Sequence, residues 1–454
     1  MSAGPISCKR MRLAEMMLGT KVGLKMPQKE KWNRYASYPV LQRKLYRRTL
    51  WIVAAAQLFG GAGIAAGVAV GALLIRELTG NENLTGLFAV FLTTGSAVTA
   101  LLAGRLTQRL GRRSVLAPGF LAGGIGAAGV VYAAAAQNLW LLFVCFFLYG
   151  AGMAANIQTR YTGADLALPS HRATAVSIAM ISSSAGAIAS PGLVGIMSGM
   201  AASFGIPSAS GPFMLAAVSY IAAGLIFLIF LRPDPYKVAN AISDARHAAS
   251  QPPHYAGDTR QMDRKGIVTG ACIVLLPQFI STGISNMTPI HMQIHGHSLN
   301  EIGFVIGMFI ASMYLPSMFS GVLTDKLGRA FMACAAAVTL MAAALLAAFA
   351  PAESLPLMAA ALALLGLGWN LGFISGTAMI VDATSPASRA KIQGRVDVLF
   401  ALAGACAGLL SGIVTAQFSY TALALSGGAL ALMLIPLLLW SRRKRHAEAN
   451  DRQL

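Results

Sequence analysis

The chain has 454 residues, of which 56% are hydrophobic and only 11% charged, and its mean hydropathy is +0.64. Soluble domains carry about 25% charged residues, so the composition excludes a water-soluble globular protein and predicts a membrane protein. The formal net charge of +19 does not indicate a nucleic-acid-binding protein, because the basic residues are not interleaved with aromatic residues on one surface.

Twelve apolar segments are each long enough to cross the hydrocarbon core of a bilayer as a helix. Because their number is even, both ends of the chain lie on the same side of the membrane. The sequence therefore predicts an all-α membrane protein with 12 transmembrane helices at residues 50–75, 84–106, 114–136, 138–161, 173–199, 211–231, 267–290, 299–323, 330–350, 354–381, 394–416 and 419–440.

Basic residues mark one side of this arrangement. All but one of the 35 lysines and arginines fall in alternate loops or in the two tails, and the exception is Arg76. Such a bias places the basic side in the cytoplasm, next to anionic lipid headgroups. We therefore predict a multi-pass protein of the bacterial cytoplasmic (inner) membrane, with cytoplasmic tails at residues 1–49 and 441–454. The first tail is alternatively a misassigned start of the chain.

Two motifs recur with a constant offset of 217 residues. The run GRLTQRLGR at residues 104–112 returns as GVLTDKLGR at residues 321–329. The pattern D-x3-P-x2-R at residues 165–172 returns at residues 382–389. Two parallel repeats, related by an axis along the membrane normal, are typical of secondary transporters.

The longest polar stretch between the predicted helices covers residues 232–266 and is rich in Pro, Asp, Arg and Gln. It separates six predicted helices from the next six. We therefore predict two pseudo-symmetric six-helix bundles, at residues 50–231 and 267–440, joined by a cytoplasmic linker.

The repeated run resembles the signature loop of the major facilitator superfamily, Gly-x-x-x-Asp-Arg-x-Gly-Arg-Arg. This resemblance covers about residues 50–440 and implies alternating access by two bundles, with the first, fourth, seventh and tenth helices around a central cavity. In such proteins the loop Asp meets the positive end of a helix from the other half and latches one state. The second copy keeps this residue as Asp325, whereas the first has Gln108, so we expect a weakened first latch.

The acidic and basic residues of the two motifs predict a gate at the cytoplasmic mouth. Asp and Arg side chains there can pair with each other and with the loop arginines, and breaking those pairs accompanies opening. The predicted gating residues are Gly104, Gln108, Arg109, Gly111, Arg112, Asp165 and Arg172 in the first half, and Gly321, Asp325, Gly328, Arg329, Asp382 and Arg389 in the second.

Polar residues are rare inside the predicted helices, and in hydrocarbon they mark functional sites. The sharpest case is Arg160, four residues after Asn156 and so on the same helix face. Arg160 either contacts an anionic group of a substrate or pairs with Asp165. The predicted substrate-binding residues are Gln57, Asn156, Arg160, Gln278, Asn286, Asn370 and Thr377.

Acidic residues are missing from the middle of the predicted helices. The titratable candidates for coupling to protons, which the resemblance leads us to expect, are Asp397, about one turn into the eleventh helix, and His291. The fifth helix resembles an antiporter motif, with Ser190 and Ile196 at two of its glycine positions. We therefore expect proton-coupled efflux of small amphipathic or drug-like compounds by a monomer.

Two other functions stay open. The first is import of a metabolite or of a transition metal such as copper, because the imidazole and thioether groups between Asn286 and His297 suit copper. However, three of the four ligands of the superfamily's copper importers are missing. The second is a transporter-like sensor, because no carboxylate is predicted at mid-membrane.

Nothing in the sequence indicates an enzyme. It contains no nucleophile triad, no H-E-x-x-H and no phosphate loop, and the cysteines lie mostly inside apolar segments without a Cys-x-x-Cys pair. We predict no catalytic residue, no cofactor and no resident metal. The expected partners are the lipid bilayer, a small-molecule substrate and protons, and not nucleic acid.

Overall fold

The computed structural model describes residue 35 and residues 38–68, 70–80, 84, 86–250, 263–351 and 353–438. This part of the chain is helical and contains no strand, and twelve of its segments are long and apolar enough to cross a membrane. The fold class is therefore the predicted one. The predicted C-terminal tail and most of the N-terminal tail lie outside the described residues.

The described residues of the N-terminal half include seven α-helices and two short 3-10 helices. They are α3 (Pro39–Val68), α4 (Gly71–Thr79), α5 (Gly86–Leu110), α6 (Arg113–Ala135), α7 (Leu139–Asp165), η2 (Pro169–His171), α8 (Arg172–Ser203), η3 (Ser208–Ser210) and α9 (Gly211–Phe230).

The C-terminal half follows a linking helix, α10 (Pro235–Ser250). Its helices are α11 (Arg264–Ile294), α12 (Leu299–Tyr314), α13 (Ser317–Leu327), α14 (Arg329–Phe349), α15 (Leu355–Ala383), α16 (Pro386–Gln417) and α17 (Tyr420–Leu432).

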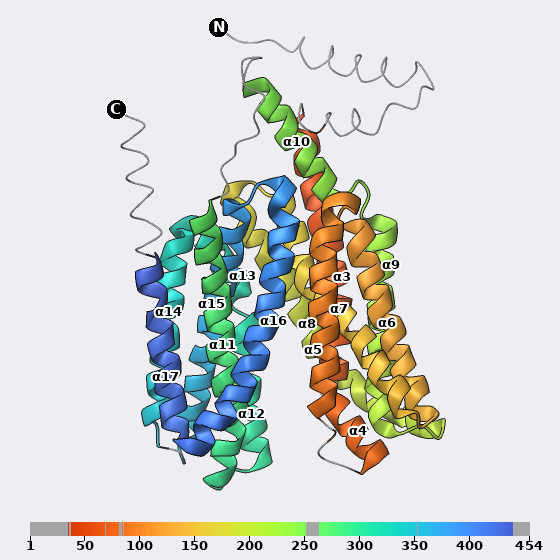
Figure 1. The fold of residues 1–454 in the computed structure, drawn as a ribbon, viewed down its shortest axis with the longest axis vertical. Coiled ribbons are helices and arrows are strands. Elements are labelled where there is room, and N and C mark those ends of the chain that lie inside the picture. Colours follow the sequence, from red (N-terminus) through yellow and green to blue (C-terminus); the bar gives the residue numbers. More distant parts are fainter. Residues whose placement is uncertain are drawn as a thin grey trace.

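The two halves stand side by side as separate bundles (Figure 1). They approach each other at the end of the molecule where α10 lies, which we call the α10 end, and diverge toward the opposite end, where α4 lies, which we call the α4 end. Helices α8 and α13, and α5 and α16, make the main contacts between the halves. Contact between the bundles is therefore concentrated toward the α10 end.

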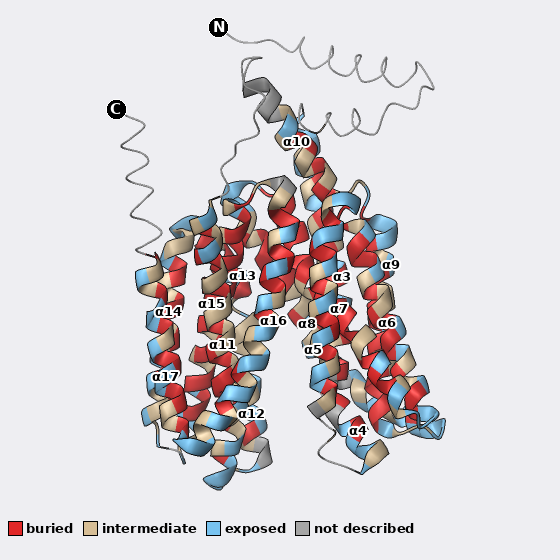
Figure 2. Cartoon of the chain, viewed as in Figure 1, coloured by how far each residue is buried: buried red, intermediate tan, exposed pale blue. Residues whose placement is uncertain are grey.

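Burial follows the same gradient along the helices that face the other half (Figure 2). In α8, Val176 and Ser177 near the α10 end are buried, whereas Ile188 and Ile196 toward the α4 end are exposed. Because one continuous helix passes from buried to exposed surface, the two bundles are packed together at one end only.

Capping side chains fix the start of several helices. The Asn138 side chain accepts a hydrogen bond from the Leu141 amide at 3.1 Å at the start of α7, and Ser298 and Glu301 form a capping box at the start of α12. Such caps satisfy amide groups that have no partner within the helix.

The predicted eighth membrane span is present as Glu301–Leu327, but its helix is interrupted between α12 and α13 at Pro316. Proline removes a backbone donor and interrupts the helix. The Asn370 amide repairs the break: its Nδ2 atom donates to the Met313 carbonyl and to the Ser317 hydroxyl, both at 2.7 Å. Within a membrane such freed backbone groups need an internal partner.

The first helix begins at Pro39, earlier than the predicted residue 50, and the linker contains a helix that the sequence analysis did not predict. Both differences have one cause. Leu45 of α3 packs with Leu166, which follows α7, and with Val238 and Ile242 of α10 in an apolar cluster. This contact stabilises two polar, basic segments as helices.

Candidate transport cavity and gate

A cavity of about 250 Å3 lies between the two bundles. Helices α3, α7 and α8 line it from the N-terminal half, and α11, α12, α15 and α16 line it from the C-terminal half. The lining residues are Gln57, Gly61, Ile64, Met153, Asn156, Ile157, Arg160, Met180, Ser183, Ser184, Ala187, Gln278, Met313, Tyr314, Trp369, Phe373 and Phe400.

The wall from the C-terminal half is aromatic. Trp369 stacks on Phe373 with ring centroids 4.6 Å apart and an angle of 13° between the rings. Phe400 and Tyr314 meet this pair at steeper angles. The indole N–H of Trp369 donates to Gln278 at 2.7 Å, which fixes the ring plane. The wall therefore offers a planar ligand a preorganised stacking surface.

The wall from the N-terminal half carries amide groups. The Asn156 Nδ2 atom donates to the Gln57 side chain at 2.7 Å, and the Gln57 Nε2 atom donates back to the Asn156 carbonyl at 3.2 Å. Ser183 donates to Asn156 at 3.4 Å. These mutual bonds hold polar groups in place opposite the aromatic wall.

An ion pair between the halves lies at the α10 side of the cavity. Arg160 of α7 donates to Asp397 of α16 at 2.7 Å, and both side chains are buried. Tyr161 donates to the same carboxylate oxygen at 3.2 Å. Asp397 lies eleven residues after the start of α16 at Pro386, so its predicted place one turn into the helix is wrong, because the helix begins earlier than predicted.

The partner of Arg160 is Asp397, which the sequence analysis did not predict as its partner. The alternative pairing with Asp165 is wrong, because Asp165 binds Arg112 and Arg389 instead. The charge of Arg160 is therefore neutralised across the two halves rather than within its own helix.

Four of the predicted substrate-binding residues line the cavity, namely Gln57, Asn156, Arg160 and Gln278. The other three, Asn286, Asn370 and Thr377, are not among its lining residues. Asn370 serves the break between α12 and α13, and Thr377 is fully buried. These three residues were predicted as substrate-binding because they are polar residues within apolar helices. For Asn370, the hydrogen bonds at the helix break explain why a polar residue is present.

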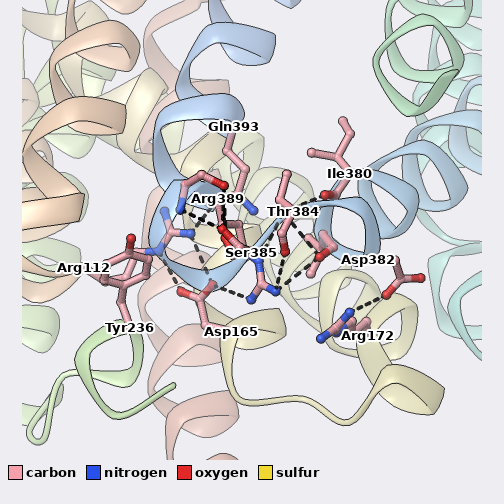
Figure 3. A network of polar contacts seen from close by, with 12 residues as sticks. Arg112, Asp165, Arg172, Tyr236, Ile380, Asp382, Thr384, Ser385, Arg389 and Gln393 are labelled. Carbon is pink, nitrogen blue, oxygen red and sulfur yellow. Dashed lines mark hydrogen bonds and ion pairs between the residues drawn. The ribbon is translucent and has the colours of Figure 1, made fainter. Parts of the chain in front are cut away.

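The gate at the α10 end contains two clusters of charge that the sequence repeat relates (Figure 3). The Asp165 cluster consists of Arg112, Asp165 and Arg389. The Arg112 Nε atom donates to Asp165 at 2.8 Å, and Arg389 lies 3.7 Å from the same carboxylate. The Nη2 atom of Arg112 also donates to Gln393 of the other half at 2.6 Å.

Arg112 lies between α5 and α6. Burial alone would lower the pKa of its guanidinium, but the Asp165 carboxylate raises that pKa above its ordinary value. Arg112 is therefore charged at every physiological pH, so the Asp165 cluster contains a permanently charged buried arginine.

The Asp382 cluster consists of Arg172, Arg329 and Asp382. Arg172 donates to Asp382 at 2.5 Å, and the Arg329 Nε atom donates to it at 3.0 Å. Arg329 also donates to the Pro169 carbonyl of the other half. In both clusters a carboxylate at the end of one helix binds one arginine from its own half and one from the other half.

Helix α8 receives a cap from the opposite half. Asp325 of α13 accepts hydrogen bonds from the Thr174 amide at 2.8 Å, the Ala173 amide at 3.2 Å and the Thr174 hydroxyl at 2.7 Å. A carboxylate at a helix N-terminus is stabilised by the helix dipole. Gln108 holds the equivalent position in the first repeat and is neutral.

Glycines let the halves approach closely beside these clusters. A Cβ atom on Gly104 of α5 would lie 2.8 Å from the Gly394 Cα atom of α16. On Gly321 of α13 it would lie 2.0 Å from the Ser177 hydroxyl of α8. These predicted gating glycines therefore lie at contacts between the halves. The exposed Arg109 lies near the end of α5, and Gly328 starts α14 with a φ of 94°.

Two residues of the linker contact the gate, which the sequence analysis did not predict. Asp234 accepts a hydrogen bond from the Arg113 amide at 2.8 Å and lies against Gly111, where a Cβ atom would be 2.5 Å from its carboxylate. The ring of Tyr236 lies 5.8 Å from the Arg112 guanidinium. The sequence Asp234-Pro235 is a helix-start signal that would have indicated this contact.

His291, the second predicted coupling residue, lies near the α4 end of α11. Its ring stacks on Tyr420 at 4.2 Å and lies 4.4 Å from the ring of His295, and it does not line the cavity. Among the described residues no group of three or more His, Cys, Asp or Glu side chains could hold a metal ion.

The family model of the Major Facilitator Superfamily matches residues 50–313 and 267–454. The chain belongs to this superfamily. It is 51% identical over 408 residues to the "Uncharacterized MFS-type transporter YdeG" of Bacillus subtilis (strain 168), covering 90% of this chain and 95% of the relative. It is 29% identical over 400 residues to the "Riboflavin transporter RfnT" of Brucella anthropi, covering 87% and 96%.

Solved structures share the fold of this superfamily member. The human organic anion transporter MFSD10 matches with a TM-score of 0.69 at 17% identity, covering 87% of this chain and 99% of that one. The proton:xylose symporter XylE matches with a TM-score of 0.66 at 16% identity, covering 87% and 96%. The chain is thus a multi-pass membrane transporter and not an enzyme.

In this superfamily transporter the cavity is closed toward the α10 end. The described hydrogen bonds and ion pairs between the halves, from Arg160–Asp397 to Arg172–Asp382, lie between the cavity and that end. The bundles diverge on the other side of the cavity.

Proposed function

We propose that this chain is a proton-coupled secondary transporter of small, planar, amphipathic compounds that works by alternating access in a bacterial inner membrane. The α10 end faces the cytoplasm, because the basic residues concentrate there. The conformation described above is then open to the outside and closed to the cytoplasm.

The observation that carries the proposal is the two-sided wall of the cavity. Trp369 and Phe373 supply an aromatic surface, and Gln57 and Asn156 supply amide groups opposite it. The cavity of about 250 Å3 is just below the range of about 300–1,000 Å3 typical of ligand pockets, which suits a small, planar compound. Met153, Met180 and Met313 add adaptable apolar contacts.

The ion pair between Arg160 and Asp397 supplies a site for coupling. A buried ion pair is costly to break unless a proton or a substrate replaces one partner. Because its two members belong to different halves, protonation of Asp397 weakens a contact that holds the cytoplasmic side closed. This link between protonation and conformation is what a proton-coupled transporter needs.

A relative favours one substrate type within this class. The riboflavin transporter of Brucella anthropi is 29% identical to this chain, and a planar heterocycle with a hydrogen-bonding edge fits between the aromatic and amide walls. Uptake of such a heterocycle is the second candidate, beside the predicted efflux of drug-like compounds.

The glycine pattern of the fifth predicted helix, which suggested efflux, has a packing explanation. A Cβ atom on Gly186 would lie 1.7 Å from the Leu58 carbonyl oxygen, so close contact between α8 and α3 requires this glycine. The histidines that suggested copper transport, His291 and His295, do not line the cavity. The sensor function predicts no flux and is tested by the same experiment.

The test is flux into proteoliposomes under an imposed pH gradient, with riboflavin, the cation tetraphenylphosphonium and Cu+ as probes. Gradient-driven movement of an organic probe that is lost in Arg160→Ala supports the proposal. Arg395→Ala is the matched control, because Arg395 is an exposed arginine two residues before Asp397, and its flux should equal that of the wild type.

Flux of an organic probe that ignores the pH gradient would refute proton coupling. Movement of copper alone would favour the metal importer, and no movement of any probe would favour the sensor. Each outcome therefore selects one of the functions that the sequence left open.

A further inference from the structure

A second cavity of about 150 Å3 lies beside the central one, between α5, α7, α11 and α16. We call it the side cavity. Met153, Ile157, Gln278 and Phe400 line both cavities. The residues that line the side cavity alone are Thr93, Ser96, Ala100, Ala154, Asp397, Ala401, Gly404 and Ala405.

The coupling ion pair is divided between the two cavities. Arg160 lines the central cavity but not the side cavity, and Asp397 lines the side cavity but not the central one. A ligand in the central cavity therefore meets the cation of the pair, and a ligand in the side cavity meets the carboxylate.

One carboxylate oxygen of Asp397 has no hydrogen-bond partner. Its Oδ1 atom accepts from Arg160 at 2.7 Å and from Tyr161 at 3.2 Å, whereas Oδ2 is buried without a hydrogen-bond partner. A buried, unsatisfied carboxylate oxygen is costly. The side cavity is mainly apolar, and the polar groups on its wall are the hydroxyls of Thr93 and Ser96, the Gln278 amide and the Asp397 carboxylate.

Arg160 has a spare donor on the other side. Its Cζ atom lies 4.3 and 4.4 Å from the ring centroids of Phe373 and Tyr161, and its Nη2 atom donates to the Tyr161 hydroxyl at 2.8 Å. Its Nε atom is buried without a hydrogen-bond partner. Arg160 is also the one charged residue that lines the central cavity of the described chain.

We propose that protons reach Asp397 through the side cavity, on whose wall its carboxylate lies, and that the substrate is an aromatic anion that binds Arg160 in the central cavity. The proton and the anion then occupy the protein together and cross it as symport. This inference rests on the proposed function and names its substrate charge and its direction of coupling.

The exchange is balanced in charge. The anionic group of the substrate replaces Asp397 as the partner of Arg160, and one proton from the side cavity converts the released carboxylate to a neutral carboxyl group. The other groups near Asp397 are Tyr161, which is uncharged, and Arg112. No uncompensated charge is left buried, which is the condition for a low cost in a membrane.

A cationic substrate fails the same condition. Binding of a cation at Asp397 would leave Arg160 buried beside two aromatic rings without a counter-ion. Efflux by antiport requires a proton and a cation to compete for one carboxylate. Asp397 is already paired with Arg160, which disfavours this competition.

Binding calorimetry on the purified full-length protein tests the charge of the substrate. The probes are naphthoate and its neutral isostere naphthamide, which share one ring system. Naphthoate should bind at least tenfold more tightly than naphthamide, and Arg160→Gln should abolish this preference. Titrations in two buffers that differ in ionisation enthalpy should count about one proton taken up per naphthoate bound, and none in Asp397→Asn.

Three outcomes overturn the proposal: equal affinity for the two probes, no binding of either, or release of protons on binding. Flux that follows the pH gradient together with proton release on binding would leave the proposed function standing and remove this inference alone. Absence of gradient-driven flux despite naphthoate and proton binding would refute the proposed function, and with it symport, while leaving the two binding sites.

Two glycines of α16 test the side cavity itself. Gly404→Leu places a side chain in the side cavity, with its Cβ atom 3.1 Å from the Gln278 Nε2 atom, whereas Gly412→Leu, on the same helix, enters open space with nothing within 4 Å. Proton uptake followed with a pH indicator in a stopped-flow instrument should slow at least tenfold in the first variant and stay unchanged in the second. Naphthamide affinity should stay within twofold of the wild type in both. An unchanged rate in Gly404→Leu overturns the side cavity as the proton route.

Discussion

The Asp165 cluster and the Asp382 cluster are built from equivalent residues of the two repeats, yet their surroundings differ. The side chains of Arg112 and Asp165 are each 1% exposed, whereas Arg329 is 18% and Asp382 31% exposed. The first cluster is covered by the start of α10, where Tyr236 lies against Arg112. The second cluster has no such cover among the described residues.

This difference in burial changes what the same charges do. In water an ion pair is worth about 0–1 kcal/mol, whereas removing one member of a buried pair costs about 3–5 kcal/mol. The Asp165 cluster is therefore an obligatory part of the closed gate. The Asp382 cluster is a contact that water can replace, so it opens at little cost.

The largest expected effect comes from Asp165→Asn. This variant leaves Arg112 and Arg389 buried without a carboxylate, so we expect a loss of about 3–5 kcal/mol in the free energy of unfolding. Asp382→Asn is the matched variant in the other repeat, with an expected loss below about 1 kcal/mol. Thermal unfolding of the two purified variants in detergent measures the difference.

The dependence of stability on ionic strength also distinguishes the Asp165 cluster from the Asp382 cluster. Raising the ionic strength from about 0.1 to 1 M shortens the Debye length from about 10 to 3 Å. The destabilisation of Asp382→Asn should then vanish, while that of Asp165→Asn should persist. Equal destabilisation of both variants, at either salt concentration, would contradict the division into a buried and an exposed cluster.

The sequence repeat was sufficient to predict the members of both clusters but not their pairing. The offset relates Asp165 to Asp382 because related helices occupy equivalent places. The choice of partner depends on how the two bundles lean against each other, which no local pattern contains. For the same reason the sequence did not predict the pair of Arg160 and Asp397, which lie 237 residues apart in the sequence.

The pattern of apolar residues also could not predict where a helix is interrupted. Pro316 divides the eighth predicted helix, and Asn370 on another helix stabilises the break. The hydropathy of residues 299–323 reports only that they lie in a membrane. The fold class follows from such averages, whereas the roles of single polar residues depend on contacts between helices.

The second prediction concerns the cap of α8. Asp325→Asn removes the negative charge that accepts two backbone amides across the halves, a change worth about 1–2 kcal/mol at a partly buried helix end. The closed gate should open more often, and Ser177→Cys, in a chain without native cysteines, should react about tenfold faster with an impermeant maleimide from the α10 side. Asp244→Asn, an exposed carboxylate of α10, is the control and should leave the rate unchanged.

The smallest expected effect comes from Gln108→Asp, which makes the first repeat like the second. The new carboxylate would face the start of α16, because the contact of Gly104 with Gly394 mirrors that of Gly321 with Ser177. A charge at such a helix end is worth about 0.3–1 kcal/mol, so the Ser177→Cys reporter should react about two- to fivefold more slowly. A faster reaction would mean that the repeats differ in helix placement here as well as in burial. A slower reaction would mean that the first latch lacks only the charge, and that the weaker latch leaves the gate easier to open on the side of α5 and α16.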